Sequence, residues 1–131
     1  MRVLALDFGR ARTGVAVSDP TGVVARPLGV VDRATTDDGL AQIERFVAQH
    51  GVERVVVGMP LTMRGEAGEQ ARETERFVEL LSGRLDVPVV TFDERFTTNL
   101  AQRGSSRTDE DARAAAHLLS DYLTWSSGAR A

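Results

Sequence analysis

Carboxylates follow two of the apolar runs in this 131-residue chain. Asp7 ends the first run, and Asp93 and Glu94 stand where a later run stops. An anion beside apolar neighbours costs free energy unless a positive partner meets it. Adjacent strand residues face opposite sides of a sheet, so only one of Asp93 and Glu94 is expected to converge on Asp7. Strand alternation alone does not choose between these two acids.

A third acidic residue, Asp111, lies at the start of a helical pattern. Positions 111, 115, 118 and 122 share one helical face, and the last three carry Ala, Leu and Tyr, which are typical of a core. We therefore expect Asp111 to lean toward the sheet. The alternative is a capping box, because Thr108 precedes Asp111 by three residues, and spacing alone favours this alternative.

Three converging carboxylates would require a cation. Two unit charges about 4 Å apart repel by about 4 kcal/mol at an effective dielectric near 20. The chain has no cysteine, so oxygen ligands predict a hard ion, Mg²⁺ or Mn²⁺. Such acidic clusters suit two-metal hydrolysis of phosphodiester bonds. The alternative for Asp7 is a turn aspartate that accepts backbone hydrogen bonds before Gly9, and both interpretations stay open.

Apolar periodicity predicts the elements that must position these acids. Period-two and continuous apolar runs bounded by turn residues indicate strands, and apolar residues at helical spacing indicate helices. The predicted strands are residues 2–7, 13–18, 23–31, 53–59 and 87–94, and the predicted helices are 35–51, 68–85, 97–103 and 109–125.

The order of these elements predicts an α/β fold. Three consecutive strands favour an antiparallel meander, and the alternation that follows favours crossovers that add parallel strands. We therefore predict a mixed five-stranded sheet with helices on both faces. Ligand sites in such sheets gather at strand ends, where Asp7 lies. We expect one domain over residues 1–125 and a mobile tail over 126–131.

Composition excludes several kinds of chemistry. All 16 basic residues are arginine, against 19 acidic residues and a net charge of −3. The absence of lysine excludes a Walker A lysine, a Schiff-base lysine and a lysine general base. The acidic balance argues against nucleic-acid binding driven by overall charge, so any such contact must be local. Without a membrane-length apolar stretch or a signal-peptide pattern, we expect a cytoplasmic protein with no membrane partner.

Four segments stand out in chain order: LDFGRARTGVAVSD, VVGMPLTMRGEAGEQA, DERFTT and DARAAAHLLSDYL. They resemble the motif blocks of the YqgF family of pre-16S ribosomal RNA nucleases, which is related to the Holliday junction resolvases. The resemblance extends from Arg2 to about Leu123. It implies an RNase H-like fold, a divalent-metal nuclease site and a role in trimming the 5′ end of the small-subunit ribosomal RNA precursor.

The resemblance also implies roles for individual residues. The family's catalytic and metal-binding acids fall on Asp7, Glu94 and Asp111, which selects Glu94 over Asp93. Arginine can hold a phosphate with a bidentate fork. The arginines of the first and third blocks fall on Arg12 and Arg95, with a surface or turn-bracing salt bridge as the alternative. Glycines in the first two blocks allow close backbone approach. Further candidate substrate contacts are Gly9, Gly58, Arg64 and Gly65.

Three classes of function remain open. The first is the nuclease acting on precursor rRNA as a monomer or homodimer, or its variant, a resolvase of branched DNA expected to act as a dimer. The second is a nucleotide-binding domain, because DFGRARTG also resembles the phosphate-binding turn of the actin and sugar-kinase superfamily. The third is a non-catalytic RNA-binding or ribosome-assembly module. It is motivated by a segment between Thr98 and Asp111 that is shorter than the family usually has.

Overall fold

The computed structural model of the chain describes residues 1–60, 68–94 and 107–129. The helix predicted at 97–103 lies outside these residues. No helix in the described ranges is both long enough and apolar enough to cross a membrane. The elements are β1 (Val3–Asp7), β2 (Arg12–Ser18), β3 (Ala25–Asp32), α1 (Asp37–His50), β4 (Arg54–Met59), α2 (Glu69–Ser82), β5 (Val89–Asp93) and α3 (Arg107–Ala129).

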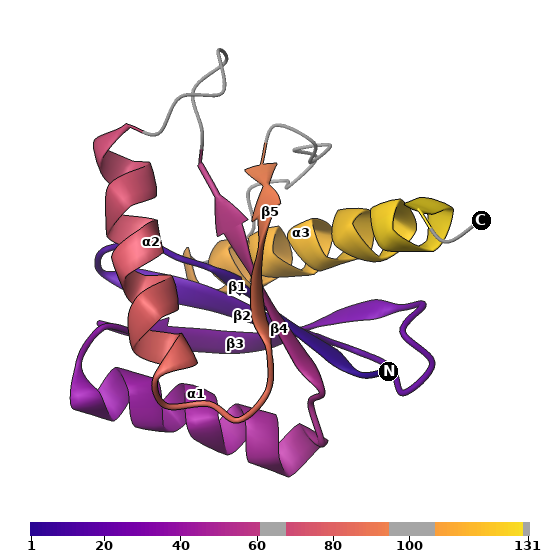
Figure 1. Cartoon of the computed structure of the whole chain (residues 1–131), viewed down its shortest axis with the longest axis horizontal. Coiled ribbons are helices and arrows are strands. Elements are labelled where there is room, and N and C mark those ends of the chain that lie inside the picture. The colour runs from indigo at the N-terminus through magenta and orange to yellow at the C-terminus, as the bar shows by residue number, and fades with distance from the viewer. Residues whose placement is uncertain (61–67, 95–106, 130–131) are drawn as a thin grey trace.

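The five strands form one mixed sheet in the order β3-β2-β1-β4-β5, as the sequence predicts. Strands β1, β2 and β3 are an antiparallel meander, while β4 pairs in parallel with β1 on one side and β5 on the other. Parallel strands end at the same edge of a sheet. The carboxyl ends of β1, β4 and β5, at Asp7, Met59 and Asp93, therefore lie along one edge (Figure 1).

Helices cover both faces of the sheet (Figure 1). On one face, α1 and α2 bury a core that includes Leu6 and Phe77, which are fully buried. On the other face, α3 packs against Val3, Ala5 and Phe92 of the sheet. Alternate residues of β1 supply the two cores, as expected when a strand is covered on both sides. The same alternation decides on which face of the sheet the side chain of Asp7, the last residue of β1, lies.

Helix α1 begins and ends as its sequence predicts. The Thr36 side chain accepts a hydrogen bond from the Gly39 backbone N–H, and the first turn carries Asp37 and Asp38. Gly51 ends the helix with φ of 60°, in the left-handed region that glycine adopts without a Cβ penalty.

Helix α3 differs from its prediction at both ends. It begins at Arg107, so Thr108 lies inside the helix and is not its N-cap, and the capping interpretation of Thr108 and Asp111 is wrong. It ends at Ala129, four residues beyond the expected end of the domain at 125. The apolar face predicted for this helix is confirmed, because Ala115, Leu118 and Tyr122 are all buried. Because α3 begins at Arg107, Asp111 lies one turn inside the helix.

Candidate active site at the carboxyl ends of the parallel strands

Asp7 is a largely desolvated carboxylate at the end of β1. Val3 and Ala5 belong to the core that faces α3, so alternation places Asp7 on that face as well. Burial is the main cause that raises the pKa of Asp7 to about 6, and the negative charge of Asp111 raises it further. The fold therefore holds this carboxylate where its charged form lacks full solvation and lies near another anion.

A glycine in β2 brings Asp111 close to Asp7. Gly14 is the β2 residue that pairs with Asp7 across the antiparallel ladder. A Cβ built on Gly14 would lie well under 3.0 Å from the backbone carbonyl oxygen of Asp111. The backbone of α3 therefore rests directly on the backbone of β2, an approach that only glycine permits. Because Gly14 has no side chain, α3 can lie close to β2, and this close approach places Asp111 near Asp7.

A second glycine leaves room for Glu94. Phe92 of β5 belongs to the core that faces α3, so Glu94, two residues later, continues on the same face as Asp7. A Cβ on Gly58 of β4 would lie 3.0 Å from Cγ and 3.1 Å from Cδ of Glu94. Burial is the main cause that raises the pKa of Glu94 to about 7, followed by the charges of Asp7 and Asp93. Alternation turns Asp93 toward the opposite face.

Arg12 supplies positive charge beside these acids. Its Nε lies 2.8 Å from Oδ2 of Asp111, and each side chain is about one-third exposed, at 33% and 30%. The contact is an ion pair without hydrogen-bond geometry, and within the described residues neither atom has a hydrogen-bond partner. Both atoms are buried, so the pair leaves polar groups that a ligand could satisfy. Arg12 is therefore placed at the acids rather than on the open surface.

The three carboxylates are electrostatically coupled through Asp7, which interacts with both Glu94 and Asp111. Among the residues that the structure describes, no group of three or more His, Cys, Asp or Glu side chains is arranged to hold a metal ion. The donor chemistry still fits a hard divalent ion, because every donor is an oxygen. The raised pKa values of Asp7 and Glu94 mark anions that a nearby cation would stabilise.

The other predicted site residues divide into two groups. Gly9 and Gly58 lie beside the acids, and in each case the structure shows a close approach. A Cβ on Gly9 would lie 2.5 Å from the backbone oxygen of Arg12, so the turn after β1 has no room for a side chain there. The remaining three, Arg64, Gly65 and Arg95, lie outside the described residues.

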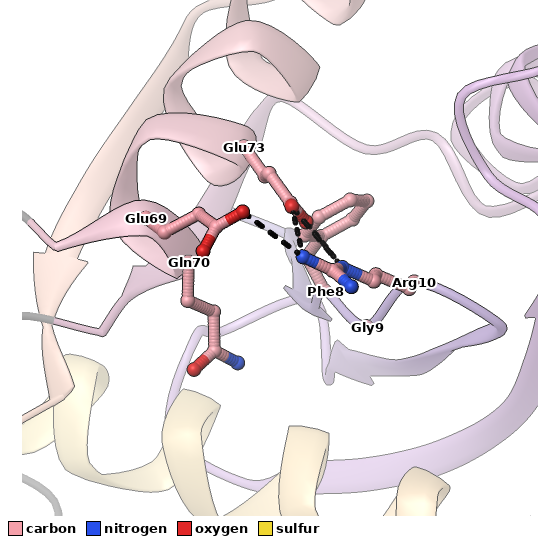
Figure 2. A pocket seen from close by; sticks show the side chains of 6 residues that line it. All are labelled: Phe8, Gly9, Arg10, Glu69, Gln70 and Glu73. Carbon is pink, nitrogen blue, oxygen red and sulfur yellow. Dashed lines mark hydrogen bonds and ion pairs between the residues drawn. The ribbon is translucent and has the colours of Figure 1, made fainter.

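Sequence reasoning missed two residues of this region. Gly14 was not selected, although a glycine within the apolar run of a central strand is typical of close backbone approach. Arg10 was also not selected, and it joins the turn after β1 to α2. Its Nε and Nη2 donate to Glu73 at 2.9 and 2.5 Å, as Figure 2 shows. Arg10 is the first arginine of GRAR, and no local pattern in the sequence links it to Glu73, 63 residues later.

Replacing Gly58 with alanine tests the space given to Glu94. The new Cβ would crowd the Glu94 side chain and Cδ2 of Leu118, which lies 3.1 Å away. Because both neighbours are flexible side chain atoms, we expect the free energy of unfolding to fall by only about 1 kcal/mol. Since Glu94 is displaced from its buried place near Asp7, we expect its pKa to fall toward the ordinary value. Urea unfolding and a titration of Glu94 by nuclear magnetic resonance measure the two effects, and an unchanged pKa would contradict this role of Gly58.

The family model described as "RuvX: Holliday junction resolvase" matches residues 1–125 of the chain. A protein of Chloroflexus aurantiacus is 43% identical over 130 residues, which cover 92% of this chain and 85% of the relative. A protein of Rubrobacter xylanophilus is 43% identical over 136 residues, covering 98% of this chain and 96% of the relative. Both relatives carry the name "Putative pre-16S rRNA nuclease".

Solved structures share the fold at low sequence identity. Thermus thermophilus RuvC in complex with a Holliday junction substrate superimposes with a TM-score of 0.60 and 19% identity. The match covers 98% of this chain and 96% of that one. The fowlpox virus Holliday junction resolvase gives a TM-score of 0.57 at 12% identity, over 95% of this chain and 99% of that one.

Proposed function

This chain belongs to the RuvX family, the YqgF family of its motif blocks, and we propose on that premise that it is a metal-dependent nuclease of precursor rRNA. Its mixed sheet with helices on both faces is the RNase H-like fold of the RuvC structures. Asp7, Glu94 and Asp111 are the proposed catalytic acids. The observation that supports this assignment best is the electrostatic coupling of Asp7 to both other acids at one edge of the sheet.

The chain's own residues prepare the site for a divalent ion and a phosphate. Asp7, Glu94 and Asp111 would hold Mg²⁺ or Mn²⁺. When bound, such ions lower the pKa of water and neutralise charge that develops on the phosphate. Burial of Asp7 and Glu94 limits the solvation of their charges, which strengthens their attraction to a cation.

Among the described residues, Arg12 is the one that we propose contacts the phosphate. Its guanidinium already lies against Asp111, so a phosphate held by the acids and their ion would fall within its reach. A guanidinium carries five N–H donors in a planar fork, and its Nε contact with Asp111 leaves other donors for a phosphate oxygen. Arg12 would therefore orient the phosphate and stabilise its charge.

The substrate proposed first is the pre-16S rRNA, because relatives at 43% identity are named as nucleases of it. The family resemblance of the motif blocks adds its 5′ end as the position of cleavage. This role would place the protein in the cytoplasm, with the small-subunit precursor as its partner. The second candidate is a Holliday junction, because the matching family model has that description. A resolvase makes two symmetrical cuts, which a homodimer would supply.

A side-by-side cleavage assay tests the proposal and chooses between the substrates. Purified protein is incubated with precursor rRNA or with a four-way DNA junction, in Mg²⁺ or Mn²⁺, with and without excess EDTA. We expect cleavage of the precursor RNA in either ion and no cleavage in EDTA, because the acids alone do not activate water. Equal activity in EDTA would contradict the metal requirement. Exclusive cleavage of the junction by a dimer would favour the second candidate.

A further inference from the structure

A pocket of about 320 Å³ lies between the turn after β1 and the first turns of α2. Figure 2 shows its lining, with Glu69, Gln70 and Glu73 contributed by the helix and three consecutive residues by the turn. Those three residues, Phe8, Gly9 and Arg10, directly follow the proposed catalytic Asp7. Alternation places Phe8 on the face of the sheet opposite to Asp7. The pocket and the acids therefore lie on either side of one strand end.

Contacts with the core and within the lining hold the walls of this pocket in place. The Phe8 ring stacks on Phe77 of the core, with ring centroids 4.6 Å apart and an angle of 21° between the planes. Gly9 carries no side chain that could fill the space, and its turn admits none, because a Cβ would lie 2.5 Å from a backbone oxygen. The Arg10 guanidinium donates three hydrogen bonds to Glu73, which joins the turn to α2. Phe8 and Gly9 therefore form the fixed floor of the pocket, and the exposed side chains of Arg10 and Glu69 lie at its rim.

The charges of the pocket do not suit an anion. Arg10 contributes one positive charge, while Glu73 and Glu69 contribute two negative ones, at 2.5 and 3.6 Å from Arg10 Nη2. A phosphate would meet two carboxylates for one guanidinium. Carboxylate oxygens accept hydrogen bonds, and the guanidinium and the Gln70 amide donate them. A neutral planar ligand with adjacent N–H donors and acceptors fits this lining best.

We propose that this pocket binds an unpaired nucleobase, guanine in preference to the others, from the strand whose phosphate lies at Asp7. Guanine presents two neighbouring donors, N1–H and N2–H₂, which match a carboxylate of Glu73 or Glu69. Its O6 and N7 are acceptors for arginine donors such as those of Arg10. Proteins read single-stranded RNA by enclosing splayed bases in this way. The inference rests on the proposed function, because the base belongs to the RNA strand that the three acids would cut.

Titration of the wild-type protein with RNA heptamers, followed by nuclear magnetic resonance in EDTA, tests the pocket without any cleavage. One heptamer is all uridine and the other carries a single central guanosine. We expect the guanosine heptamer to bind at least about tenfold more tightly, which corresponds to about 1.4 kcal/mol. We also expect it to shift the backbone amide signals of Gly9, Arg10 and Gln70. Equal affinity for the two heptamers, or shifts confined to other residues, would overturn the proposal.

Glu73→Gln is the informative variant, and Glu75→Gln is its matched control. Both change one glutamate of α2, but Glu73 lines the pocket while Glu75 is exposed. We expect Glu73→Gln to abolish the preference for guanosine, because an amide offers one acceptor oxygen where the carboxylate offers one to each of N1–H and N2–H₂. We expect Glu75→Gln to keep the preference. Retained preference in Glu73→Gln would overturn the proposal. A protein that binds guanosine in this pocket but never cleaves would contradict the proposed function alone.

Discussion

Replacing Asp7 with asparagine should lower the rate of nucleic-acid cleavage by about 10³-fold or more while leaving the protein folded. Asparagine keeps the size of the side chain but removes the charge that interacts with both Glu94 and Asp111. Loss of one positioned electrostatic group from an enzyme commonly lowers the rate by about 10²- to 10³-fold, and Asp7 is coupled to both other acids. Single-turnover cleavage of precursor rRNA at saturating Mg²⁺ measures the effect.

A second acid provides the control for this substitution. Asp86 is exposed and lies just before β5, at the edge of the sheet opposite to the one that carries the acids. Asp86→Asn makes the same chemical change away from the acids, and we expect it to cleave as the wild type does. Equal activity of wild type and Asp7→Asn would remove Asp7 from the mechanism.

The same variant should make the protein more stable near neutral pH. The pKa of Asp7 is raised from 3.8 to about 6, and that of Glu94 from 4.5 to about 7. Between about pH 4 and pH 7 the folded protein therefore binds more protons than the unfolded chain. The free energy of unfolding must then fall as the pH rises through this window. For Asp7 the shift corresponds to roughly 3 kcal/mol.

Asp7→Asn removes this penalty, and it also removes one of the charges that raise the pKa of Glu94. We expect the variant to exceed the wild type by about 2 to 3 kcal/mol at pH 7.5 and to match it near pH 4. Urea unfolding at the two pH values measures the difference. A variant that is less stable than the wild type at pH 7.5 would contradict a desolvated, repelled Asp7.

Apolar periodicity was sufficient to predict the architecture. Continuous runs such as VVVGM indicate a strand covered on both faces, and Val55, Val56 and Val57 are indeed fully buried within β4. Helix α3 shows its predicted buried face because the spacing of Ala115 and Leu118 follows the helical repeat. These patterns are local, so a single sequence records them. The limits of α3 were less well predicted, since its core pattern extends neither to Arg107 nor to Ala129.

The site depends on contacts between residues that are distant in the sequence. Strand alternation could not choose between Asp93 and Glu94 without knowing which face Phe92 occupies, and the family resemblance supplied that choice. The ion pair of Arg12 and Asp111 and the clamp of Arg10 on Glu73 join residues about 99 and 63 positions apart. No local pattern in the sequence indicates either pair. The packing of α3 on β2 and of α2 beside β1 creates both contacts.

Gly14→Ala should have a large effect on both stability and cleavage, because it opposes that packing directly. The new Cβ would meet the backbone of Asp111 and Ala112, which cannot rotate away as a side chain does. We expect the free energy of unfolding to fall by about 3 kcal/mol or more, at the upper end of the cost of overpacking. In the molecules that remain folded, the start of α3 must move from β2, and we expect cleavage to fall about 10²-fold as Asp111 leaves Asp7.

Gly29→Ala separates this effect from the general cost of replacing glycine in the sheet. A Cβ on Gly29, in the neighbouring strand β3, would meet no atom within 4 Å. We therefore expect this variant to have the free energy of unfolding and the cleavage rate of the wild type. Thermal melts and single-turnover cleavage at a temperature where all three proteins are folded make the comparison. If Gly14→Ala cleaved at the wild-type rate, the position of Asp111 beside Asp7 would not matter for catalysis, and the chemistry would have to depend on Asp7 and Glu94 without it.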